Sequence, residues 1–204
     1  MAALIAATLT ASTLYFFVLP ARDSGAPVSH EDGSGPLAST GDPSGYQSMF
    51  IENNEPTETF GYSLCVRDAS VPATIDTISP LQAVGTGVTY LGGRVRYLQL
   101  ALGDQDLIST HPFPPNVPGP LSDVIGAEVS WPCNEINSLY TELDLGLARQ
   151  GNAGGGWLGF NIAYHAGGKK YVLILHDQLL LCGPSVTSWC HSAFPSPSPS
   201  AGAS

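Results

Sequence analysis

Charged residues are scarce in this chain, and basic residues are the scarcest. Only 12% of the 204 residues are charged, and 7 Lys and Arg stand against 17 Asp and Glu, which gives a formal net charge of −10. Binding to a nucleic-acid backbone or to an anionic membrane surface requires clustered Lys and Arg. The composition therefore argues against both ligands, and we expect no nucleic-acid partner.

Motifs of the common catalytic and metal sites are also missing. The sequence contains no P-loop, no Gly-x-Ser-x-Gly of a serine hydrolase, and no His-Glu-x-x-His or Cys-x-x-Cys of a zinc site. Only 2 Met occur, which counts against a Met-based copper site. We therefore predict no cofactor, no metal site and no catalytic residue, and we do not expect an enzyme.

The apolar run at the N-terminus indicates a membrane anchor. Residues 2–19 carry no charge and, as a helix, would span about 27 Å, close to the hydrocarbon thickness of a bilayer. A cleaved signal peptide needs a basic segment before the run and a small-x-small cleavage site, and neither is convincing here. We expect residues 1–20 to be a transmembrane anchor or uncleaved signal that holds the rest outside the cytoplasm; cleavage would make the protein secreted.

Two segments have the composition of disordered chain. Residues 21–50 are rich in Gly, Pro, Ser and Asp without hydrophobic periodicity, which predicts a flexible stalk with His30 as a solvated side chain. Residues 187–204 alternate Pro and Ser, which favours an extended, solvated tail. The folded domain is expected between them, at residues 51–186.

This domain has the pattern of an all-β fold. Leu143, Leu145 and Leu147 alternate with polar residues or Gly, as they do in a strand with one buried face. Short strands bounded by Pro, Gly or Asp favour an antiparallel β-sandwich, Ig-like in general shape, with an open barrel as the alternative. Residues 111–120 hold five prolines and predict a surface loop. The expected strands are residues 60–67, 74–79, 84–90, 94–102, 127–131, 140–148, 158–165, 170–176 and 179–181.

The most specific local prediction is a β-hairpin at Gly167-Gly168. Two glycines supply the positive φ angles that a two-residue hairpin turn requires. A shift of the pairing register by one residue would move the apolar residues of one strand to the opposite face, so only the unshifted register brings those of both strands to one face. Beyond the hairpin, Asp177 would fall opposite Leu158, so a bend is expected at residues 176–178. The predicted pairs are Tyr164 with Tyr171, Ile162 with Leu173, and Phe160 with Leu175.

The four cysteines point to disulfide bonds. Cys65, Cys133 and Cys182 lie at or near the ends of expected strands, and an exported domain commonly cross-links such positions. Four cysteines allow three complete pairings, and the spacing does not choose among them. We favour one bond among these three, with Cys190 either paired to Cys182 or unpaired.

Several segments of the domain resemble an uncharacterised family of small actinobacterial proteins that are membrane-anchored or secreted. The resemblance covers about residues 60–183. It implies an extracytoplasmic β-sandwich with cross-linked cysteines, and it brings no activity, cofactor or catalytic residue. The segments are Gly61-Tyr62-Ser63-Leu64-Cys65-Val66, Pro132-Cys133, Tyr140-Thr141-Glu142-Leu143, Gly154-Gly155-Gly156-Trp157 and Leu180-Leu181-Cys182-Gly183.

Four residues are weak candidates for a binding site. His176 and Asp177 sit at the expected bend, where a polar pair forms either a site or merely a turn. Trp157 should point away from the face that carries Phe160, so it could stack on a sugar or a partner protein, or cover the rim of a second sheet. Trp131 is a further aromatic candidate.

Paired carboxylates on one strand face allow a different hypothesis. Glu142 and Asp144 point the same way and could serve as paired carboxylates in glycoside hydrolysis, but we favour the simpler interpretation that they lie on the wet outer face of a sheet. We therefore predict a membrane-anchored domain with a binding or structural role at the cell envelope, through an envelope protein or a glycan. The alternatives are a carbohydrate-binding module and an envelope-active hydrolase.

Overall fold

The computed structural model describes six segments of the chain, and the expected anchor at residues 1–20 and tail at residues 187–204 lie outside them. Over the part described, no helix has the length and apolar character needed to cross a membrane. The described residues are 25–32, 34–40, 56–99, 109–110, 112–135 and 139–182.

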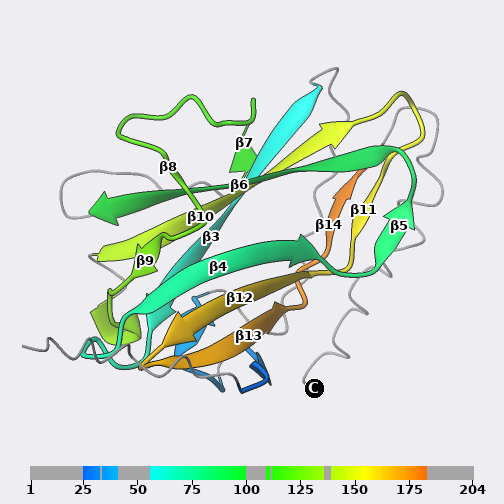
Figure 1. Ribbon diagram of the computed structural model, residues 1–204. Helices are drawn as coiled ribbons and strands as arrows, with labels where there is room; N and C mark the ends of the chain where they lie inside the picture. Colours follow the sequence, from blue (N-terminus) through cyan, green and yellow to red (C-terminus); the bar gives the residue numbers. More distant parts are fainter. Residues whose placement is uncertain are drawn as a thin grey trace, which may run out of the picture.

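The described part is all-β and forms three sheets (Figure 1). The five-stranded sheet has the order β1 (Val28–Glu31), β13 (Lys169–Leu175), β12 (Phe160–Ala166), β4 (Ala73–Pro80) and β9 (Glu128–Val129). The six-stranded sheet has the order β2 (Leu37–Ser39), β3 (Thr57–Val66), β10 (Leu139–Arg149), β6 (Val88–Gln99) and β8 (Ser122–Asp123), and β7 (Ser109–Thr110) also pairs with β3. The small sheet has the order β14 (Leu179–Leu181), β11 (Gly155–Trp157) and β5 (Ala83–Gly85); a short 3-10 helix, η2, covers Cys133–Glu135.

One hydrophobic core lies between the five-stranded and six-stranded sheets. Each strand sends alternate side chains into it, because successive side chains of a strand point to opposite faces. Leu145 of β10 and Phe60 of β3 meet Ile162 of β12 in one cluster, and none of the three is exposed. Burying each such side chain stabilises the fold by about 1.5–3 kcal/mol. The expected alternation of residues 140–148 is confirmed, within β10.

The predicted hairpin is confirmed in turn and register. Gly167 and Gly168 have φ angles of 55° and 76°, the positive values that the turn needs. In the β12–β13 pairing, Tyr164 lies opposite Tyr171, Ile162 opposite Leu173, and Phe160 opposite Leu175.

Gly159 breaks the alternation that the sequence suggested before this hairpin. Its φ is +147°, and a Cβ there would lie 2.2 Å from the carbonyl oxygen of Leu175, so only glycine fits. The strand expected at residues 158–165 therefore begins only at Phe160, and β11 ends before it in another sheet. Residues 176–178 interrupt the strand as expected, but Leu179–Leu181 then pair with β11 rather than extending the hairpin.

The expected stalk contributes two strands, so its prediction as flexible chain is wrong for residues 25–32 and 34–40. β1 pairs in parallel with β13, and β2 pairs antiparallel with β3, where Leu37 is fully buried. His30 is not simply solvated, since its Nε2 lies 2.6 Å from the Tyr164 hydroxyl. These strands are too short to show a periodicity, and they gain their stability by covering the edges of long strands.

Truncation of Phe160 tests the core. We expect Phe160→Ala to lower the free energy of unfolding by about 3–5 kcal/mol, because it empties a site without solvent exposure. Asn161→Ala, on the opposite face of β12, is the control and should cost less than about 1 kcal/mol. Urea denaturation measures both, and equal losses would contradict the assigned faces.

Candidate functional site

His176 lies beside Glu31 at the surface. It follows β13, and its Nε2 is 2.6 Å from Oε2 of Glu31 at the end of β1. With Asp32 and Asp177, these residues line a recess of only about 40 Å³. Both partners are more than half exposed, at 58% and 61%, so their attraction is weakened by solvent.

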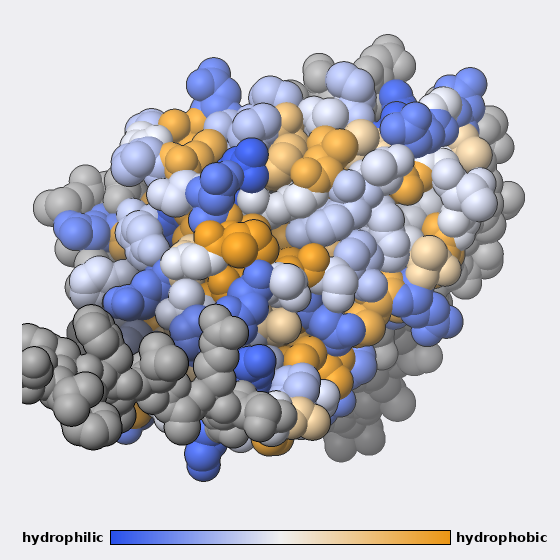
Figure 2. Space-filling model, in the orientation of Figure 1, coloured by the Kyte–Doolittle hydropathy of each residue, from blue (hydrophilic) through white to orange (hydrophobic). Residues whose placement is uncertain are grey.

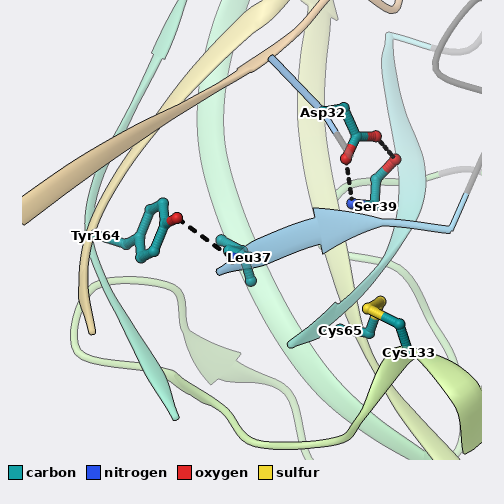
Figure 3. The surroundings of a disulfide bond; sticks show 6 residues. All are labelled: Asp32, Leu37, Ser39, Cys65, Cys133 and Tyr164. Carbon is teal, nitrogen blue, oxygen red and sulfur yellow. Dashed lines mark hydrogen bonds between the residues drawn. A yellow bond between two sulfur atoms is a disulfide. The ribbon is translucent and has the colours of Figure 1, made fainter. Parts of the chain in front are cut away.

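Hydrogen bonds beside this recess tie the two N-terminal strands together. Asp32 accepts hydrogen bonds from the backbone N–H and the hydroxyl of Ser39, at 2.9 and 2.5 Å (Figure 3). Its carboxylate is thereby committed to the turn between β1 and β2. Within the described ranges, no group of three His, Cys, Asp or Glu residues is placed to hold a metal ion.

The two candidate tryptophans serve the fold. Trp157 packs half-buried against the core, with its ring 6.2 Å from those of Tyr90 and Phe160. The prediction that it points away from Phe160 is wrong. The unusual backbone angle of Gly159 interrupts the strand, so side chains before and after it no longer alternate between the two faces of one sheet. Trp131 is also half-buried, and its carbonyl accepts a hydrogen bond from the Val66 N–H at 2.8 Å. Its buried Nε1 has no hydrogen-bond partner among the described residues.

A disulfide joins Cys65 of β3 to Cys133 of η2, with the Cα atoms 4.9 Å apart (Figure 3). This confirms the expectation of one bond among Cys65, Cys133 and Cys182. Cys182 is also disulfide-bonded, whereas Cys190 lies outside the described residues. The bond fixes the end of the segment 112–135 to β3, next to the bridge between Val66 and Pro132.

The pair Glu142 and Asp144 is buried, so the prediction of a wet outer face is wrong. Their side chains are 1% and 0% exposed. Arg96 lies opposite Glu142 on β6, and its Nε donates a hydrogen bond to Oε2 of Glu142. The same nitrogen is 4.0 Å from Oδ2 of Asp144. Two carboxylates thus meet one guanidinium inside the molecule.

A proline-rich segment covers part of this polar face. The ring of Phe113 lies over Gly146, where a Cβ would be only 2.4 Å from it. The Phe113 N–H donates to Oγ1 of Thr57 at 3.0 Å, and the Thr59 hydroxyl donates to the Pro112 carbonyl at 2.9 Å. Residues 112–120 contain no strand and are mostly exposed, which confirms the predicted surface loop for this range, while Phe113 packs on the sheet.

Burial controls the protonation of Asp144. Loss of solvent, followed by repulsion from Glu142, raises its pKa from 3.8 to about 8, although Arg96 acts in the opposite direction. Asp144 is therefore protonated at neutral pH. Neither of its oxygens has a hydrogen-bond partner among the described residues. Once protonated, its O–H can donate to Glu142, so the two carboxyl groups share one proton.

A groove of about 330 Å³ lies between β4 and β6. Figure 2 shows apolar side chains gathered near the middle of this face, in the region between β6 and β4 in Figure 1. Ile125, which is 59% exposed, is the most accessible large apolar side chain of the groove. The lining residues are Ile78, Tyr90, Gly92, Gly93, Arg94, Asp123, Val124 and Ile125.

The groove lies between two incompletely paired sheet edges. β8 pairs only with Arg94 and Val95 of β6, and β9 pairs only with Ala73 and Thr74 of β4. On β4, Ile75 also exchanges backbone hydrogen bonds with Gly126 and Ala127, and no described strand pairs with the remaining outer sides of β4 and β6. The sequence did not reveal this groove, because its walls come from segments that are distant along the chain.

Comparisons with known proteins add little to this description. No family model matches the sequence. No curated protein matches it either. Among solved structures, the chain is similar to one described as "Structure of Vibrio cholerae VesB protease", with 8% identity and a TM-score of 0.33. The match covers 72% of this chain and 32% of that one, and a similarity this low carries no argument.

Removal of the disulfide tests its contribution to stability. It closes a loop with a sequence separation of 68, so Cys65→Ala with Cys133→Ala should cost about 4 kcal/mol in the chain-entropy model. Reductant should lower the melting temperature of the wild-type protein but have a smaller effect on this double variant. Equal effects of reductant on both proteins would contradict the prediction.

The two buried carboxylates should respond oppositely to neutralisation. Glu142→Gln removes the charged acceptor of the Arg96 hydrogen bond and should lower the free energy of unfolding by about 3 kcal/mol. Asp144→Asn removes a charge that the fold disfavours and should raise it by about 1–2 kcal/mol at pH 8. Urea denaturation at pH 8 distinguishes the two, and a loss of stability in both variants would contradict the assignment.

The same pair predicts how stability depends on pH. Because folding raises the pKa of Asp144, the folded state binds this proton more tightly than the unfolded state does. This contribution to stability is complete below about pH 4, falls by about 1.4 kcal/mol per pH unit as the pH rises towards 8, and is constant above that. Asp144→Asn should flatten this part of the pH profile, and an unchanged profile would contradict the prediction.

Proposed function

We propose that this chain is a membrane-anchored, extracytoplasmic protein whose β domain, a β-sandwich of Ig-like general shape, binds an envelope partner. The groove between β4 and β6 is the observation that carries the binding role. The Cys65–Cys133 bond supports an oxidising compartment, since such bonds are rare in the reducing cytosol.

An extended polypeptide is the partner that best fits the groove. Open sheet edges offer backbone donors and acceptors to an added strand, and apolar side chains beside them accept its alternate residues. Ile78 and Val124 provide such apolar contacts, and the Arg94–Asp123 ion pair, 3.3 Å long, adds polar ones. A glycan fits less well, because the Tyr90 ring already packs against Trp157 and Phe160.

Bulges limit the length of strand that can be added. In β4 the pairing register shifts around Asp76, and in β6 it shifts around Leu91. A bulge twists the strand and interrupts its row of hydrogen-bonding groups, which also protects an edge from uncontrolled aggregation. The ligand is therefore a short segment of a few residues in extended conformation.

Peptide selection tests this binding role. The full chain should enrich linear peptides from a displayed library, and Ile125→Asp should weaken the binding of a selected peptide at least tenfold. Val28→Asp is the matched control, because Val28 is 56% exposed and lies on β1, the opposite edge of the five-stranded sheet. Absence of enriched peptides, equal weakening by both variants, or binding on a glycan array instead would overturn the proposal.

Localisation is tested separately. In intact cells, a protease that cannot cross the membrane should cleave the domain, and its cysteines should resist alkylation until they are reduced. Protection from the protease together with free thiols would overturn the extracytoplasmic assignment.

A further inference from the structure

Asp144 and Arg94 are cross-strand neighbours that do not contact each other as an ion pair. They are directly paired in the β10–β6 register, so their side chains leave the same face of the sheet with Cβ atoms about 4.5–5.5 Å apart. The Arg94 guanidinium instead lies 3.3 Å from Asp123 and 6.0 Å from the centre of the Phe113 ring, and it donates to the Gly93 carbonyl at 2.9 Å.

This arrangement suits a neutral Asp144. A protonated carboxyl group attracts a cation only weakly, so Arg94 is free to bind Asp123, which is 82% exposed. An ionised Asp144 would be a buried charge, and attraction to a buried charge is less screened by solvent than attraction to an exposed one. When Asp144 ionises, it therefore attracts the Arg94 guanidinium more strongly than Asp123 does.

Charged groups face Asp144 from its own strand and from β6. On its own strand the neighbour is Glu142, which repels a second negative charge. On β6, the Nε of Arg96 lies 4.0 Å from Oδ2 of Asp144 but donates its hydrogen bond to Glu142, whereas Arg94 is paired directly with Asp144 in the strand register. On β3, the residue paired with Asp144 is Gly61, which carries no charge. Among the described residues of the segment that covers this face, Asp123 is the charged residue concerned, and its ion pair is with Arg94.

We propose that Arg94 is a pH-dependent switch: when Asp144 releases its proton to solvent, the Arg94 guanidinium leaves Asp123 and Phe113 and pairs with Asp144. No covalent bond changes. Phe113 and Asp123 belong to the segment that covers the polar sheet face, so this segment loses two contacts to the sheet. Arg94 and Asp123 also line the groove, so one wall of the groove changes with them. The elevated pKa of Asp144 places the change near pH 8.

NMR of the isotope-labelled full chain between pH 6 and 9 tests the switch. We expect the Arg94 Nε–H, the Phe113 ring and the Asp123 amide to change together with one midpoint near pH 8. In Asp144→Asn these changes should disappear, because the remaining amide cannot ionise. A wild-type transition confined to β10 and Arg96, or an unchanged transition in Asp144→Asn, would overturn the proposal.

Asp123→Asn separates a switch from a purely structural role. Asp123 is exposed, so its neutralisation leaves the core intact. Because it removes the competing partner of Arg94, it should ease ionisation of Asp144 and lower the midpoint by about 0.5 pH unit, the effect expected from an exposed ion pair. An unchanged midpoint in this variant would show that Arg94 does not move between the two carboxylates.

Discussion

Burial of β10 on both faces is the constraint on which the rest of the structure depends. From Thr141 to Ala148 every residue of this strand is buried. A strand in this position is usually apolar throughout, whereas here only one face is. The other face carries Glu142 and Asp144, so the fold must supply a guanidinium, exclude water and retain one proton. The position of Arg96, the covering segment and the raised pKa of Asp144 all follow from this requirement.

Local patterns predicted the parts of the fold that local physics determines. The Gly167-Gly168 hairpin was predictable with its register, because the turn and the period of two jointly allow one solution. Gly159 was not, because its backbone angle is imposed by the carbonyl of Leu175, which only the folded structure brings near. The strands β1 and β2 escaped detection for a related reason: they are stabilised by the edges that they cover and not by their own sequence.

The candidate site was likewise predictable only in its local part. Alternation correctly placed Glu142 and Asp144 on one face, but it could not show that Phe113 and its neighbours lie over that face. The basic partner of the two carboxylates did leave a signal in the sequence. Arg94 and Arg96 alternate on another expected strand, in a chain with only 7 basic residues, and two such bases match two alternating acids. Matching opposite charges across strands would have paired these two segments from the sequence alone.

The parallel direction of β1 decides where the chain enters the domain. Val28 pairs with Tyr171 and Glu31 with Ile174, so the chain enters the five-stranded sheet at the end that holds the Gly167-Gly168 turn. The exposed Lys169 and Lys170 lie at this same end, as does the start of β4, because Ala73 pairs with Ala166. In the proposed anchored protein, this basic end of the sheet would therefore be the one nearest the tether.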